Sequence, residues 1–132
     1  MNTKLVMASS AVILGATGIV LTFIPDEILS HLSIEANKTA LLLWQILGAL
    51  YFAFAMLNWM TKTSLIGGIY NRPIAIANFT HFLIAGLALI KDIISNPSVS
   101  YIIWIAVIFY CVFGISFGAI LFRHPHERNE IE

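Results

Sequence analysis

Charged side chains are scarce in this sequence. Only 11% of its 132 residues are Asp, Glu, Lys or Arg, whereas 59% are hydrophobic. A soluble domain usually has roughly 25% charged residues, so the composition favours a protein that lies in lipid. The formal net charge is zero, which removes any whole-chain electrostatic attraction to nucleic acid, and we expect no nucleic-acid partner.

Four long stretches contain no Asp, Glu, Lys or Arg: residues 5–25, 39–61, 73–90 and 93–122. A charge at the centre of a bilayer costs at least about 2.5 kcal/mol, and about 20 residues of helix cross the hydrocarbon core. We therefore predict an all-α membrane protein in which four antiparallel transmembrane helices form one bundle. The predicted spans are residues 5–25, 39–61, 73–90 and 98–122, within a single domain of residues 1–132 that ends in a short cytoplasmic tail at 123–132.

Cysteine is also nearly absent. The single Cys111 lies in the fourth predicted span, so an intrachain disulfide is impossible. The sequence has no paired nucleophile and base, no phosphate-binding loop and no cluster with the spacing of metal ligands. We therefore expect a non-enzymatic protein with no catalytic residue, no metal site and no cofactor.

Basic residues are distributed unevenly between the two sides that four spans define. Only Lys38 and Lys91 lie on the side opposite the termini. By the positive-inside rule, the side with more basic residues is cytoplasmic, which predicts a multi-pass protein of the cell (inner) membrane with cytoplasmic N and C termini. The basic residues on the predicted cytoplasmic side are Lys4, Lys62, Arg72, Arg123 and Arg128.

The connection between the first two spans has helical signals of its own. Pro25 suits the first position of a helix, and Asp26 and Glu27 suit its positively polarised end. Ile28, Leu29 and Leu32 recur at helical spacing. We predict a short amphipathic helix that lies on the outer membrane surface.

Small residues mark the faces on which membrane helices can approach closely, because lipid supplies no hydrophobic force between helices. The fourth span has Gly114 and Gly118 four residues apart, and the first span has Ala11 and Gly15 at the same spacing. These stripes predict either packing inside one bundle or, for Gly114 and Gly118, a contact between copies of the chain.

Polar residues within the spans are few, and they are the candidates for a ligand site or a pore. His81 lies about 12 Å along the third span, near the bilayer centre. Asn78 shares its helix face, and the opposite direction of the second span brings Asn58 to the depth of Asn78 and Gln45 above His81. The candidates among them are Gln45, Asn58, Asn78, Thr80, His81 and Ser116.

Two interpretations of these polar residues remain open. The side chains can form satisfied hydrogen bonds that join the second and third spans, or His81 can bind a proton, an anion or a polar head group. Arg72, at the inner end of the third span, can meet a phosphate or an anionic lipid, or it can simply anchor the helix at the interface.

The run Asn78-Phe79-Thr80-His81-Phe82 resembles the polar, phenylalanine-bearing third span of small fluoride channels. The first two spans lack that family's arginine and asparagine pattern, so the chain is not assigned to it.

The leading functional hypothesis is a membrane subunit that contacts membrane lipids and assembles with copies of itself or with a membrane-protein partner. One alternative is a small channel or carrier with a polar route past Gln45, Asn58, Asn78 and His81. Another alternative is binding of a lipid, quinone or porphyrin beside His81.

Overall fold

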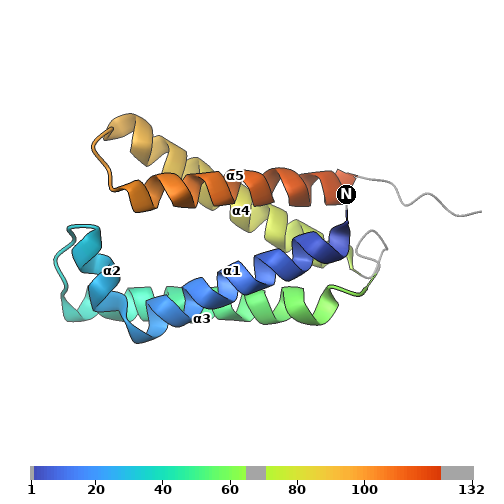
Figure 1. The fold of residues 1–132 in the computed structure, drawn as a ribbon, viewed down its shortest axis with the longest axis horizontal. Helices are drawn as coiled ribbons and strands as arrows, with labels where there is room; N and C mark the ends of the chain where they lie inside the picture. The colour runs from blue at the N-terminus through green and yellow to red at the C-terminus, as the bar shows by residue number, and fades with distance from the viewer. Residues whose placement is uncertain (1, 65–70, 123–132) are drawn as a thin grey trace, which may run out of the picture.

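Five helices make up the computed structural model, which describes residues 2–64 and 71–122, and these residues contain no strand. Four of the helices are long and apolar enough to cross a membrane, so the prediction of an all-helical chain with four such helices is confirmed. The predicted tail at 123–132 lies outside the described residues. The helices are α1 (Thr3–Phe23), α2 (Pro25–His31), α3 (Lys38–Thr61), α4 (Arg72–Ser95) and α5 (Tyr101–Phe122) (Figure 1).

Asparagine side chains cap two of the long helices. The side chain of Asn2 accepts a hydrogen bond from the backbone N–H of Leu5 at the start of α1, and that of Asn37 accepts one from Ala40 at the start of α3. Each cap satisfies a backbone donor that the first helical turn leaves unpaired.

The short helix predicted between the first two spans is present as α2. Pro25 is its first residue, and α1 ends at Phe23 instead of continuing to 25, because a proline disfavours helical geometry in the residue before it. At its other end Ser33 adopts a left-handed φ of 57°, and the N–H of Ile34 reaches back to the carbonyl of Leu29 at 2.9 Å. This is the Schellman arrangement that ends many helices.

Charge did not predict where α4 ends. The third predicted span stopped at residue 90, but α4 continues through Lys91 and Asp92 to Ser95. Charged residues are unfavourable in hydrocarbon but acceptable in a helix, so they mark the expected edge of the bilayer and not the end of the helix.

The long helices pack as two pairs, α1 with α3 and α4 with α5 (Figure 1). Along the first pair the contacts run in opposite chain directions, with Gly15 facing Ala55 and Gly18 facing Gly48. A Cβ atom added at Gly18 would lie only 2.7 Å from the carbonyl oxygen of Gly48 and 2.8 Å from the backbone nitrogen of Phe52. The two backbones are therefore closer than any side chain would allow.

The second pair is packed less closely. A Cβ atom at Gly118 would lie 3.1 Å from the ring of Phe79, and one at Gly114 would lie 3.8 Å from the Cβ of Phe82. The Gly114–Gly118 stripe thus faces α4 of the same chain. Ala11 of α1 is buried.

The two pairs share one apolar core, which contains residues from all four long helices. Within it the ring of Phe82 stacks on those of Phe113 and Phe117, with centroids 5.1 and 5.7 Å apart. Away from this core the pairs diverge, and α2 lies at the open end (Figure 1). The core residues are Met7, Leu14, Ala55, Ala75, Phe82, Phe113, Phe117 and Ile120.

We predict that Gly18→Ala destabilises the α1–α3 pair by about 1–3 kcal/mol, the usual cost of overpacking, because the new methyl group would meet backbone atoms. The measurement is the midpoint of thermal unfolding in detergent. Gly15→Ala is the matched control, since its Cβ would meet that of Ala55 at an ordinary 3.5 Å and alanine favours the helix. Equal midpoints for the two variants would contradict the close approach at Gly18.

Candidate functional site

Three buried polar side chains from three helices form a closed hydrogen-bonded group, here called the asparagine node (Ser10, Asn58 and Asn78). The amides of Asn58 and Asn78 each donate to the other's oxygen at 2.8 Å, and Asn58 also donates to the hydroxyl of Ser10 at 3.0 Å. All three residues have 0% of their surface exposed. The node therefore connects α3 of one helix pair to α4 of the other, with α1 attached.

The remaining hydrogen-bonding groups of the node are used within its own helices. Ser10 donates to the carbonyl of Met7 at 2.9 Å, and Asn78 donates to that of Ile74 at 3.0 Å. Among the described residues, no buried side-chain nitrogen or oxygen lacks a partner. The node has the geometry of a structural joint and offers no unpaired group to a ligand.

His81 lies one turn further along α4, inside a group of aromatic rings. Phe54 stacks on the imidazole at a centroid distance of 5.1 Å, and the rings of Tyr51, Phe82 and Tyr110 lie 5.2–5.6 Å away. The Nε2 atom is 3.5 Å from the hydroxyl of Tyr110, which also bonds to the hydroxyl of Tyr51. One face of His81 is thus covered, and its nearest polar neighbour is a tyrosine pair that joins α3 to α5.

The other predicted candidates do not join this group. Gln45 is exposed, and its amide lies 3.5 Å from the carbonyl of Thr22. Thr80 and Arg72 are exposed and Ser116 is half-buried. The structure has a cleft between the two helix pairs, a hollow between α4 and α5 and a polar hollow beside the connection after α2. None of these three is lined by the residues proposed for a polar route, Gln45, Asn58, Asn78 and His81.

A cleft of about 620 Å³ lies between the two helix pairs, where they diverge. Tyr51, Phe82 and Tyr110 of the aromatic group lie on its wall, and no charged side chain lines it. Its exposed lining is almost entirely apolar. The lining residues are Ile13, Leu14, Ala16, Thr17, Val20 and Leu21 of α1, Ile28 of α2 and Leu32 after it, Trp44, Leu47 and Tyr51 of α3, Phe82, Ala85, Ala88 and Leu89 of α4, and Ile102, Ile103, Ala106, Phe109, Tyr110 and Phe113 of α5.

Alanines keep the cleft open, because each leaves space that a larger apolar residue would fill. Ala16, Ala85, Ala88 and Ala106 contribute such positions from three helices. The apolar side of α2 faces the same space through Ile28, so this helix borders the cleft at its open end.

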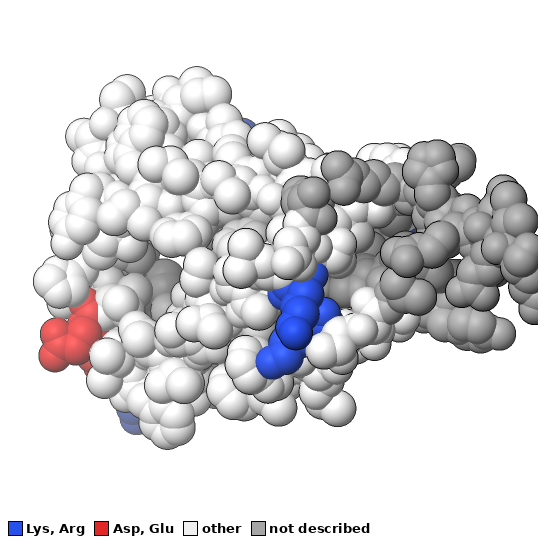
Figure 2. Space-filling model, turned by 45° about the vertical axis from the view of Figure 1, so that its right-hand side comes forward, with Lys and Arg blue, Asp and Glu red and all other residues white. Residues whose placement is uncertain are grey.

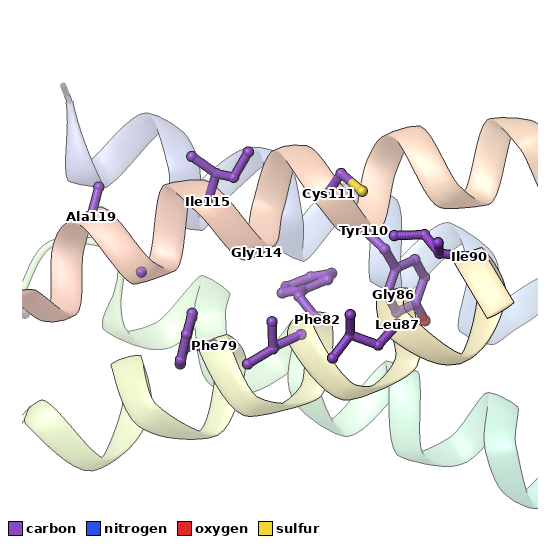
Figure 3. Close-up of a pocket in the computed structure, with 12 residues that line it drawn as sticks. Phe79, Phe82, Gly86, Leu87, Ile90, Tyr110, Cys111, Gly114, Ile115 and Ala119 are labelled. Atoms are coloured by element: carbon purple, nitrogen blue, oxygen red, sulfur yellow. The ribbon is translucent and has the colours of Figure 1, made fainter.

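A second, shallower hollow of about 270 Å³ lies in the seam between α4 and α5. Figure 3 shows Phe79, Phe82 and Leu87 on the α4 side of the hollow and Cys111 and Ile115 on α5, with α1 and α3 behind. The hollow is open on one side, where the glycines of the seam leave room between the helices.

The outer surface of the helices is largely apolar, and most of the face in Figure 2 is uncharged. Large side chains such as Phe23, Ile94 and Ile115 expose 75–77% of their surface. Apolar surface on this scale is typical of contact with a membrane or a partner. Among the described residues, no three His, Cys, Asp or Glu side chains lie close enough to hold a metal ion.

Sequence reasoning did not identify Ser10, Tyr51, Tyr110 or the cleft. The available signal was two tyrosines in the middle of predicted spans, since a buried tyrosine hydroxyl usually needs a partner. No protein family, curated protein or solved structure matches this chain, so the site is interpreted from its own geometry.

We predict a measurable coupling between Asn58 and Asn78 in a double-mutant cycle of the two leucine substitutions. Each single variant leaves one amide buried without its partner, whereas the double variant removes both amides. The double variant should therefore be less destabilised than the sum of the single variants, by about 0.6 kcal/mol and at most about 1.7 kcal/mol, the average and the maximum measured for hydrogen bonds between membrane helices. Reversible unfolding in bicelles provides the four free energies, and strict additivity would argue against the joint.

Proposed function

We propose that this chain is an integral membrane protein whose cleft holds the hydrocarbon part of an amphiphile. In this proposal the four long helices cross the cell membrane as an antiparallel bundle and form one domain, with both termini on the cytoplasmic side. The apolar outer surface and the restriction of charge to the ends of the helices support insertion. The uneven distribution of basic residues supports the orientation.

The observation that supports the binding role is the size and lining of the cleft. The cleft has a volume of about 620 Å³, is open to its surroundings and has an almost entirely apolar lining. A bound water needs two to four polar partners, so in a bilayer this space suits hydrocarbon better than water. A hydrocarbon chain suits it, because the lining offers apolar contacts on every helix.

The polar end of the ligand does not belong in the cleft. The hydroxyls of Tyr51 and Tyr110 are hydrogen-bonded to each other, and no charged side chain lines the cleft. A charged or strongly hydrated group would lose its water there without compensation. We propose a binding role without catalysis, in which the protein holds the apolar part of its ligand.

Self-association is a second candidate, favoured by the open hollow between α4 and α5. In lipid, helices associate where small residues allow close contact, and Gly86, Gly114 and Gly118 border this hollow. Gly118→Leu would not test the contact cleanly, because its side chain would meet the ring of Phe79 within the chain. A partner subunit in place of a second copy would use the same face.

The polar route is not part of this proposal. Asn58 and Asn78 bond to each other, and Gln45 lies exposed on the outside of its helix pair. Porphyrin binding at His81 is equally unsupported, because its Nε2 atom lies 3.5 Å from the hydroxyl of Tyr110 and His81 lines none of the three described cavities.

We predict that the two ends of the long helices lie on opposite sides of the membrane. Single cysteines at Ser33 and Ser64, introduced after Cys111→Ala, should react with an impermeant maleimide from opposite faces of oriented vesicles, with Ser64 on the cytoplasmic face. Labelling of both positions from the same face would contradict the four-span arrangement.

We predict that Ala85→Leu combined with Ala106→Leu lowers retention of bound lipid at least about fivefold, because the added side chains occupy the cleft and weaken binding by roughly 1 kcal/mol or more. Native mass spectrometry from nanodiscs measures both the retained lipid and the number of chains per particle. The control is Ala53→Leu, an exposed position on α3 that lines no described cavity. Equal retention in all three proteins would contradict the proposed role, and a single chain per particle would contradict self-association.

A further inference from the structure

A polar hollow of about 540 Å³, here called the vestibule, lies at the open end of the cleft. The connection after α2 forms one wall, and the end of α4 with the connection to α5 forms the other. Leu32 and Ile103 line both the vestibule and the cleft, so the two spaces are adjacent. The vestibule residues are His31, Leu32, Ser33, Ile34, Asp92, Asn96, Ser98, Val99, Ser100 and Ile103.

The two spaces are arranged as the head and tail of a lipid require. Ten residues of α4 separate Asp92 in the vestibule from Phe82 on the wall of the cleft, which corresponds to about 15 Å of helix. That is half of the ~30 Å hydrocarbon core, the depth of one leaflet. A lipid with its head in the vestibule can therefore extend its chain to the deep part of the cleft.

The charge of the vestibule selects among head groups. Asp92 is its only formally charged residue, and it is exposed. Around it, the connection of residues 24–38 and the end of α4 carry more acidic than basic side chains. The acidic residues are Asp26, Glu27, Glu35 and Asp92, and the basic ones are Lys38 and Lys91. An anionic head group would be repelled here, and a cationic group would be attracted.

The neutral groups of the vestibule can bind both parts of a zwitterionic head group. Ser33, Asn96, Ser98 and Ser100 bring hydroxyl and amide oxygens, and the hydroxyl of Ser98 is held by the side chain of Asn96 at 2.7 Å. A primary ammonium has three N–H donors and no acceptor. Asp92 and these oxygens can accept its hydrogen bonds, and the hydroxyl and amide N–H groups can donate to the phosphate of the same head group.

We infer that the vestibule binds the head of a zwitterionic phospholipid with a primary ammonium, from the leaflet at the α2 end, while one of its chains fills the cleft. This inference rests on the proposed function, because it assigns the head of the same ligand. The vestibule selects the head group, and the cleft provides the apolar contacts that keep the lipid bound.

The test uses nanodiscs with equal amounts of phosphatidylethanolamine and phosphatidylglycerol that carry identical chains. Native mass spectrometry should find phosphatidylethanolamine retained over phosphatidylglycerol by about 1.4-fold to fivefold, the range expected from one exposed charge interaction. Asp92→Lys should abolish or reverse this preference, and Asp92→Asn should reduce it. Asp26→Lys is the matched control, because it makes the same charge change at the same end on an exposed residue outside the vestibule.

The outcomes separate the two proposals. Three results would overturn the assignment of the head group and leave the cleft as a lipid site. The first is equal retention of the two lipids, and the second is a preference for phosphatidylglycerol. The third is the same lipid preference in Asp92→Lys as in Asp26→Lys. If the wild-type chain is released from the nanodiscs without any bound lipid, the proposed function is overturned as well.

Discussion

The hydrogen bonds among Ser10, Asn58 and Asn78 determine how the two halves of this protein are joined. Lipid is as apolar as a leucine side chain, so helices in a bilayer are not driven together by the hydrophobic effect. Contact between the two pairs runs from the end where the asparagine node lies beside the apolar core to the middle of the helices, where Tyr51 of α3 bonds to Tyr110 of α5. The amides are satisfied only when α3 and α4 meet, so their burial favours one relative position of the pairs at that end.

The opposite ends of the pairs are under no such constraint. The close contact of Gly18 with Gly48 holds α1 against α3 near the open end, but it draws α1 toward its own partner and not toward α5. The alanines that face the other pair are too small to reach across. Strong packing within each pair, with only the asparagine node and the Tyr51–Tyr110 hydrogen bond as polar connections described between them, therefore leaves an apolar cleft, with α2 at its open end (Figure 1).

Much of the fold could be predicted from the sequence, since a charge-free window of about 20 residues has few alternatives to a long apolar helix. The start of α2 was equally clear, because proline and acidic residues act within one helical turn. The opposite directions of the second and third spans predicted that Asn58 lies near Asn78, and in the structure the two side chains are in contact.

The cleft could not be predicted, because it depends on the angle between two helix pairs. In lipid, apolar residues cover every face of a span, so hydropathy does not show which face turns inward. Ala85 and Ala106 look the same in sequence whether they face lipid, a neighbouring helix or an open space. The contact of Gly18 with Gly48 was missed for a related reason, since Ala11 and Gly15 offered an equally good stripe on the same helix.

The central claim is that the helix pairs diverge around hydrocarbon, and NMR in nanodiscs tests it most directly. Leu47 of α3 and Leu89 of α4 line the cleft from opposite pairs. The sample is a deuterated protein that carries protonated leucine methyl groups. The account predicts cross-peaks from lipid chain protons to the methyl groups of both leucines and none between the two leucines. Direct cross-peaks between Leu47 and Leu89, without any to lipid, would show that the pairs close on each other and would contradict the account.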